Sequence, residues 1–175
     1  LIEKAFALGT GAFVVKLSGV GVDGNRVKPS QQAKIHIDYL TAQQIIPLTI
    51  RNGRIVEAAF VSENTVRGKK YIYLETHELE NGGYRVTNEY FLVDGDRLIP
   101  EPLPEGVAEI FNTGSDIPLF AIFSPNIVNT YPDSHGLGVS VYAHALDNLK
   151  SVDLAFNNFC RDFALGGKKV FYREG

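Results

Sequence analysis

Turn signals divide the middle of the sequence into strand-like runs, and they constrain the fold more than any other feature. Each signal separates two runs rich in β-branched and aromatic residues, and the three are Asn52-Gly53, Asn81-Gly82-Gly83 and Asp94-Gly95. Such pairs favour the tight turn of a β-hairpin, because the turn positions adopt positive φ. Since no helical pattern lies between these runs, the sequence predicts an antiparallel meander sheet.

Two helices are expected to flank this sheet. Ile2, Ala5 and Phe6 recur at helical spacing, and Gly9 stands where a helix C-cap is expected. Residues 139 to 165 contain no proline or glycine and carry one apolar stripe, formed by Val141, Ala145, Leu149, Val152, Phe156, Phe159 and Phe163. This stripe predicts one long helix that buries these side chains and ends at Gly166-Gly167. The expected fold class is therefore α+β, an antiparallel meander sheet packed with one long C-terminal helix and a short N-terminal helix.

The run "AKIHIDYL" alternates apolar and polar residues. Ile35, Ile37 and Tyr39 fall on one face, which we expect to be buried, while His36 and Asp38 share the polar face. His36 and Asp38 are a possible metal pair, but no third ligand lies nearby in the sequence. We therefore interpret them as part of a solvated strand face.

Length and composition fit one globular domain over residues 1–175. Seventeen basic and 20 acidic residues give a net charge of −3, so no overall basic signature for nucleic acid is present. A single cysteine excludes an internal disulfide, and no apolar run is long enough to span a membrane. Because the chain lacks methionine and opens directly on a helical pattern, we expect it to be a piece of a larger protein.

The glycines of "ALGTGAFVV" are not interpreted as a phosphate-binding loop. Such loops run from strand to glycines to helix, so that the helix N-terminus faces the anion. Around Gly9 and Gly11 the order is reversed, which predicts a helix-to-strand corner.

Other chemical candidates are equally weak. Asp23 and Asn25 resemble part of a calcium loop that lacks its later acidic ligand, so a mobile turn is preferred. Cys160 is interpreted as a buried small hydrophobe. Glu75 and Glu78 fall on opposite faces of a strand and so do not form an obvious acid/base pair. The residue types of a catalytic triad occur too close together in the sequence to converge on one site; these residues are Asp133, Ser134, His135 and Ser140. The sequence thus predicts no catalytic, cofactor-binding or metal residues, and no enzyme.

Several segments together resemble one family. They are "EKAFALGTGAFVV", "IDYLTAQQIIPLTIRNGRIVEAAFVS" and the region from Pro125-Asn126 through Leu137-Gly138-Val139-Ser140, Leu149-Lys150 and Asp153 to Gly166-Gly167-Lys168-Lys169. This pattern resembles the portal, or head–tail connector, proteins of tailed bacteriophages, within the branch of long-tailed phages of Gram-positive bacteria. Such chains are often labelled minor capsid proteins. The resemblance is weak between residues 64 and 111.

The resemblance implies a structural virion protein that forms a homo-oligomeric ring, usually of twelve subunits, at one capsid vertex. The full-length parent would contact capsid, scaffold, terminase and tail-adaptor proteins, and DNA would pass through its channel. This piece resembles the body, or wing, which we do not expect to bind DNA or a membrane itself. Its location would be the virion, and the host cytoplasm during assembly.

A possible subunit contact lies on the polar face of the long helix, at Asp147, Lys150, Asp153 and Asn157. Two alternatives remain open at the level of sequence. The chain could be another minor structural or tail component of a phage, or a ligand-binding domain or enzyme with an unrecognised site.

Overall fold

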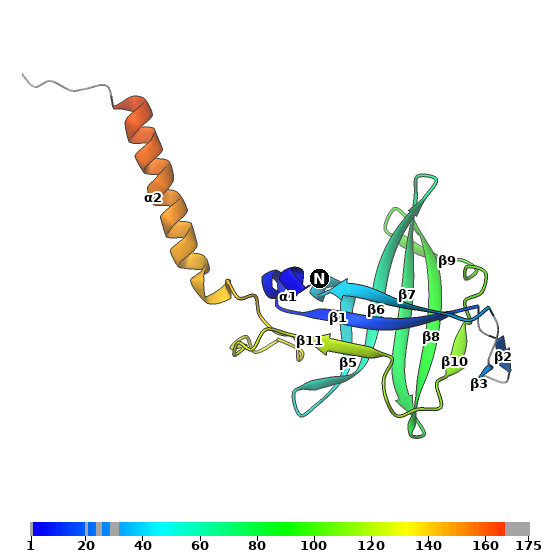
Figure 1. The fold of residues 1–175 in the computed structure, drawn as a ribbon. Coiled ribbons are helices and arrows are strands. Elements are labelled where there is room, and N and C mark those ends of the chain that lie inside the picture. The colour runs from blue at the N-terminus through cyan, green and yellow to red at the C-terminus, as the bar shows by residue number, and fades with distance from the viewer. Residues whose placement is uncertain (1, 20, 24–25, 29–31, 167–175) are drawn as a thin grey trace, which may run out of the picture. The chain divides into compact units, whose positions relative to one another are not determined.

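The computed structural model describes residues 2–19, 21–23, 26–28 and 32–166 (Figure 1). The chain forms two compact units, Leu1–Ser140 and Val141–Gly175. The first unit is α+β and contains helix α1 (Ile2–Leu8), two β-sheets and a short 3₁₀ turn, η1 (Ala42–Gln44). The second unit contains the 3₁₀ turn η2 (Ala143–Ala145) and helix α2 (Leu146–Leu165).

The smaller sheet has three antiparallel strands in the order β11-β1-β4, namely β11 (Phe120–Phe123), β1 (Gly11–Ser18) and β4 (Lys34–Thr41). Val14 of β1 pairs with Phe120 on one side and Asp38 on the other. Because paired residues point to the same face, this register fixes which side chains of the sheet face inward.

The larger sheet has the order β2-β3-β10-β8-β7-β6-β5, with β9 paired to β8 beside this path. Its strands are β2 (Gly21–Asp23), β3 (Arg26–Lys28), β5 (Ile45–Arg51), β6 (Arg54–Val66), β7 (Lys69–Glu80), β8 (Gly83–Asp94), β9 (Arg97–Pro100) and β10 (Ile110–Asn112). The pairs are antiparallel except for a one-residue parallel contact between β3 and β10. Figure 1 shows the strands of the smaller sheet running across the long strands β6, β7 and β8, so the unit resembles a half-barrel.

The hairpin turns confirm the sequence prediction. Asn52 and Gly53 have φ of 50° and 73°, and Asn81 and Gly82 have 50° and 83°. A further turn at Arg67-Gly68, which the sequence did not indicate, joins β6 to β7 with φ of 51° and 79°.

The core lies between the two sheets. It contains Ala12, Val14, Leu40 and Phe120 from the smaller sheet and Ile45, Ala58, Phe60 and Tyr84 from the larger sheet and its edge. Phe120 stands edge-on to Phe60, with ring centroids 5.3 Å apart, and to His77 at 5.4 Å. The aromatic side chains therefore join the sheets at the centre of the unit.

The corner at Gly9 is the predicted helix-to-strand junction. The Gly9 amide donates to the Ala5 carbonyl at 2.7 Å, and its φ of +88° ends α1. The Thr10 hydroxyl accepts a 2.8 Å hydrogen bond from the Gly138 amide, so this corner also holds the chain segment that follows β11.

Several sequence predictions were wrong. Asp23, expected in a mobile turn, ends the short strand β2, which pairs with β3, whereas Asn25 lies outside the described residues. The long helix begins at Leu146 rather than at residue 139, because Val139 is buried in the first unit beside Gly9. Gly166 caps α2 as expected, while Gly167 and the residues beyond it lie outside the described range.

The predicted burial of the apolar stripe is also wrong. No side chain of α2 is buried, and Phe156 is 62% exposed. Cys160, expected to be buried, is exposed on the same helix.

Candidate functional site

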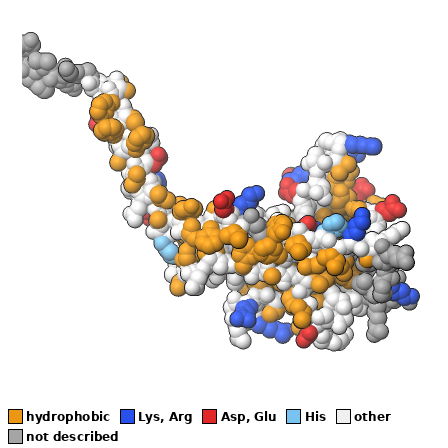
Figure 2. Space-filling view, in the orientation of Figure 1, with side chains coloured by type: hydrophobic (Ala, Val, Ile, Leu, Met, Phe, Trp, Pro, Cys, Tyr) orange, Lys and Arg blue, Asp and Glu red, His pale blue; other side chains and the backbone are white. Residues whose placement is uncertain are grey.

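The smaller sheet presents an apolar face to the outside. We define the outer apolar face as the side chains opposite the core, namely Phe13, Val15, Leu17, Ile35, Ile37, Tyr39, Ala121 and Phe123. Ile35 is 71% exposed, and Ile37 and Tyr39 are also more exposed than buried. Figure 2 shows hydrophobic side chains gathered over the region where Figure 1 places β1 and β11.

This orientation reverses the sequence prediction for β4. Leu40 belongs to the core, and the two-residue period then directs Asp38 inward and Tyr39 outward. A one-residue shift of register would restore the predicted faces, but it would remove Leu40 from the core. The apolar residues that the sequence assigned to the interior therefore form an exposed surface.

A charged cluster lies on the inner side of the same strands. The Lys16 ammonium is 2.8 Å from Asp38 Oδ2 and 3.6 Å from Glu75 Oε2. It also lies 4.6 Å above the centre of the Tyr73 ring. Lys16 and Asp38 belong to the smaller sheet and Glu75 to the larger one, so the Lys16–Glu75 pair connects the two sheets.

His77 completes this cluster. Its Nε2 is 2.8 Å from Glu75 Oε1, and its ring is fully buried between Phe60 and Phe120. Glu75 is 3% exposed, so a molecule in solution has no direct access to the pair. Glu75 and Glu78 lie on opposite faces of β7, as the sequence predicts, whereas the pairing of Glu75 with His77 and Lys16 had no signal in the motifs of the sequence.

A neutral hydrogen-bonded pair borders the charged cluster. The Tyr73 hydroxyl donates to Asn88 Oδ1 at 2.7 Å, and the Asn88 amide donates to the Ala108 carbonyl at 2.7 Å. Burial, with the negative charges of Glu75 and Asp38 nearby, raises the pKa of the Tyr73 hydroxyl well above its usual value. Tyr73 therefore remains a neutral donor in the folded protein.

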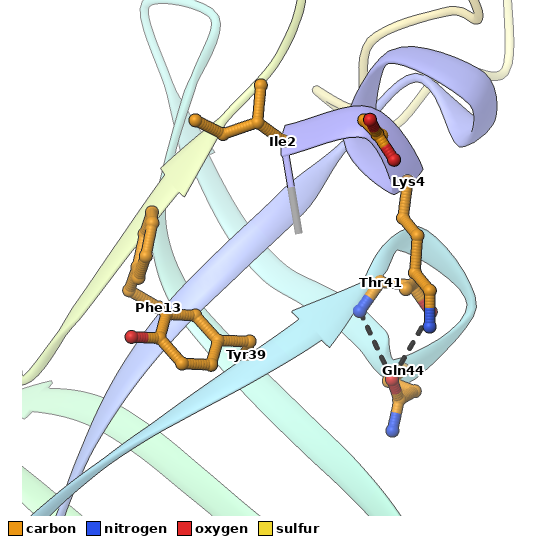
Figure 3. Close-up of a pocket in the computed structure, with 7 residues that line it drawn as sticks. Ile2, Lys4, Phe13, Tyr39, Thr41 and Gln44 are labelled. Carbon is orange, nitrogen blue, oxygen red and sulfur yellow. Dashed lines mark hydrogen bonds between the residues drawn. The ribbon is translucent and has the colours of Figure 1, made fainter.

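An open pocket of about 520 Å³ lies at one end of the outer apolar face, where α1 meets β1 and β4 (Figure 3). Its lining residues are Ile2, Glu3, Lys4, Phe13, Tyr39, Thr41 and Gln44. The rings of Phe13 and Tyr39 meet edge-on with centroids 5.2 Å apart and form an aromatic wall.

Some polar groups of this pocket already form hydrogen bonds within the chain. Gln44 Oε1 accepts hydrogen bonds from the amide and the hydroxyl of Thr41, and Gln44 Nε2 donates to the Val61 carbonyl. The pocket therefore offers mainly an apolar wall with Glu3 and Lys4 beside it. This chemistry suits an apolar side chain of a partner better than a polar small molecule.

The predicted contact residues lie together on one exposed face of α2. They are Asp147, Lys150, Asp153 and Asn157, at helical spacing. Its role as a subunit contact stays a prediction.

Other sequence candidates do not form sites. His36 is exposed on β4, and Asp38 pairs with Lys16 rather than with His36. Asp133, Ser134 and His135 occupy irregular turns before α2. Among the described residues, no group of three or more His, Cys, Asp or Glu side chains could hold a metal ion, and no helix is long and apolar enough to cross a membrane.

Comparisons with protein-family models, with curated proteins and with solved structures find no match to this chain.

Proposed function

We propose that this chain is an assembly module, the body or wing part of a phage portal ring. The observation that carries the proposal is the outer apolar face, where Ile35, Ile37 and Tyr39 are exposed beside the pocket under α1. Large exposed apolar surfaces on soluble proteins mark sites of protein–protein contact. The portal assignment itself comes from the resemblance of the sequence segments around Gly9, Asn52-Gly53 and Leu137-Gly138.

The inner ion cluster supports an assembly role. The apolar face of a sheet is normally the face that packs into the core. Here Lys16 and Asp38 pair with each other on the inner face, and Lys16 also pairs with Glu75 of the larger sheet. Turning the sheet over would expose Val14 and Leu40 and break these pairs. The outer apolar face is thus held outward, available for a neighbouring subunit.

The proposed role is mechanical rather than chemical. The ring would support head assembly, allow DNA to pass during packaging and anchor the tail. A net charge of −3 is compatible with this role, because the body of a ring need not be basic to enclose a DNA duplex that it does not bind. Capsid, scaffold, terminase and tail-adaptor proteins would contact the full-length protein at a vertex of the virion.

The alternatives differ in what they require. Another minor structural or tail component would use the same apolar face without forming a portal ring. A ligand-binding domain would use the pocket between α1 and Tyr39 and would bind a small molecule saturably.

A substitution on the outer apolar face tests the proposal. In the full-length protein, Ile37→Asp should prevent assembly measured by light scattering, because it places a charge in a contact between subunits. Glu78→Asp, on an exposed position of β7, is the control and should assemble normally. Full assembly of the Ile37→Asp protein would remove the support that the outer apolar face gives to the proposal.

A further inference from the structure

The exposed apolar side of α2 has the spacing of a coiled coil. We define the seam as Leu149, Val152, Phe156, Phe159 and Phe163, which follow one another at intervals of three, four, three and four residues. All five side chains are between 51% and 74% exposed. This spacing is the a and d pattern of a heptad repeat.

The width of the seam indicates what can cover it. A helix that packs on a sheet or in a globular core carries an apolar surface that extends into the e or g positions, whereas a narrow a/d seam suits one other helix. The flanking e and g positions between the first and last seam residues are Asp153, Ala155, Cys160 and Asp162. None of these four is a large apolar residue, so the seam is narrow.

The covering helix must also be long enough. The seam covers 14 residue steps, or about 21 Å at the usual helical rise. Of the α-helices in the described residues, α1 has seven residues and α2 has 20. Only α2 matches the length of the seam, and we therefore propose that α2 of a second copy of this chain packs along the seam to form a two-helix coiled coil.

The surface area fits a weak dimer. Each aromatic side chain can bury about 150 to 250 Å². At the observed exposures, each seam offers on the order of 500 Å², so a pair would bury about 1,000 Å², close to the lower limit for a specific interface. The contact should form reversibly and depend on protein concentration.

The charges beside the seam permit this pairing. In a parallel pair, Asn148 at a g position faces Asp153 at the following e position, and Ala155 faces Cys160. In the symmetric antiparallel pair, Asp153 faces Cys160 and Asn148 faces Asp162. Two carboxylates therefore do not oppose each other in either orientation.

The seam also differs from most of the contact that the sequence suggested, with which it shares only the flanking Asp153 at an e position. Its large side chains lie apart from Lys150 and Asn157, which occupy b positions of the same heptads and stay in solvent in a two-helix pair. The inference rests on α2 and does not depend on the proposed portal function. A full-length protein that forms rings without helix pairing would leave the portal proposal intact and remove this one.

Sedimentation equilibrium of the 175-residue chain tests the pairing. The chain should pass from monomer to dimer as its concentration rises over about a hundredfold range. Phe156→Glu should raise the dissociation constant at least about a hundredfold, because both copies would bury an unpaired carboxylate. Val152→Gln, a milder change in the seam, should weaken the dimer in the same direction.

Leu154→Glu is the matched control. Leu154 is an exposed leucine of the same helix at an f position, and its substitution should leave the dissociation constant within about twofold. Far-UV circular dichroism of each monomeric variant establishes that the β-rich unit is folded. The inference is overturned if the chain stays monomeric, if Phe156→Glu dimerises like the unaltered chain, or if Leu154→Glu weakens the dimer as strongly as Phe156→Glu.

Discussion

The Nε2 atom of His77 lies 2.8 Å from the Oε1 atom of Glu75, and both side chains are buried between the two sheets. On its other side the Glu75 carboxylate faces the Lys16 ammonium at 3.6 Å. Glu75 is thus the group through which a histidine of the larger sheet and a lysine of the smaller sheet are joined.

Removal of Glu75 should therefore weaken the whole first unit. Glu75→Ala leaves Lys16 without its partner in the larger sheet and leaves His77 Nε2 unpaired, and we expect a loss of about 3 kcal/mol in the free energy of unfolding. Urea denaturation measures this loss. Glu78→Ala, at an exposed position three residues along the same strand, should change the free energy by less than about 0.5 kcal/mol. Equal effects of the two substitutions would contradict a structural role for the cluster.

The raised pKa of Tyr73 predicts how stability depends on alkaline pH. A free tyrosine ionises near pH 10. Above that pH the unfolded chain releases the Tyr73 proton while the folded chain retains it, so the unfolded state is favoured and stability falls. Below that pH both states keep the proton and this contribution is fully present.

Tyr73→Phe isolates this effect. Near neutral pH the variant should be less stable by about 1 kcal/mol, because it loses the hydrogen bond to Asn88. From about pH 10 upward the difference should shrink, since the variant cannot release that proton. The comparison of the two proteins cancels the contributions of Tyr84 and Tyr90, whose pKa values burial also raises. A difference that stays constant or grows with pH would disprove the assignment.

Gly9 is predicted to be irreplaceable for steric reasons. A Cβ atom at Gly9 would lie 2.5 Å from the Gly138 carbonyl oxygen, and φ at this position is +88°. Gly9→Ala should cost about 3 kcal/mol, from the left-handed backbone and from the displaced neighbouring chain. Gly53 also has positive φ, but a Cβ atom there would have no neighbouring atom within 4 Å. Gly53→Ala should therefore cost only about 1 kcal/mol in the same thermal or urea unfolding experiment.

The two large aromatic residues Phe60 and Phe156 should respond differently to truncation. Phe60 is 1% exposed in the core, and Phe60→Ala should lower the free energy of unfolding by about 3 to 5 kcal/mol. Phe156→Ala, measured at a concentration where the chain is monomeric, should change it by less than about 1 kcal/mol. A loss at Phe156 as large as that at Phe60 would mean that the seam is buried within a single chain.

Local signals in the sequence predicted most of the secondary structure. Asn52-Gly53 and Asn81-Gly82 require the conformations that they adopt, and the order of elements around Gly9 predicted the corner. The helix start at Leu146 was missed because the apolar periodic pattern extends back to Val141. Val139, where the helix was predicted to begin, is instead buried by tertiary packing. Helical periodicity alone does not show whether a residue joins the helix or is held outside it by packing against another segment.

The candidate site was largely invisible in the sequence. Alternation in β4 correctly separated Ile37 from Asp38, but alternation alone cannot show which face is inside. Leu40 and the pairing of Val14 with Asp38 decide it, and both depend on the position of the larger sheet. The signal that could have been used is Lys16, which shares a face with Ala12 and Val14 and therefore needs buried partners such as Glu75.

Electron microscopy of the full-length protein tests the central claim most directly. Negatively stained particles should be closed rings of about a dozen subunits around a central hole, because a cyclic assembly repeats one heterologous contact until it closes. Under the same conditions the 175-residue chain should give only monomers and small oligomers, because the proposed ring contacts would need the rest of the full-length protein. Full-length protein that forms no ring under any assembly condition would contradict the portal assignment.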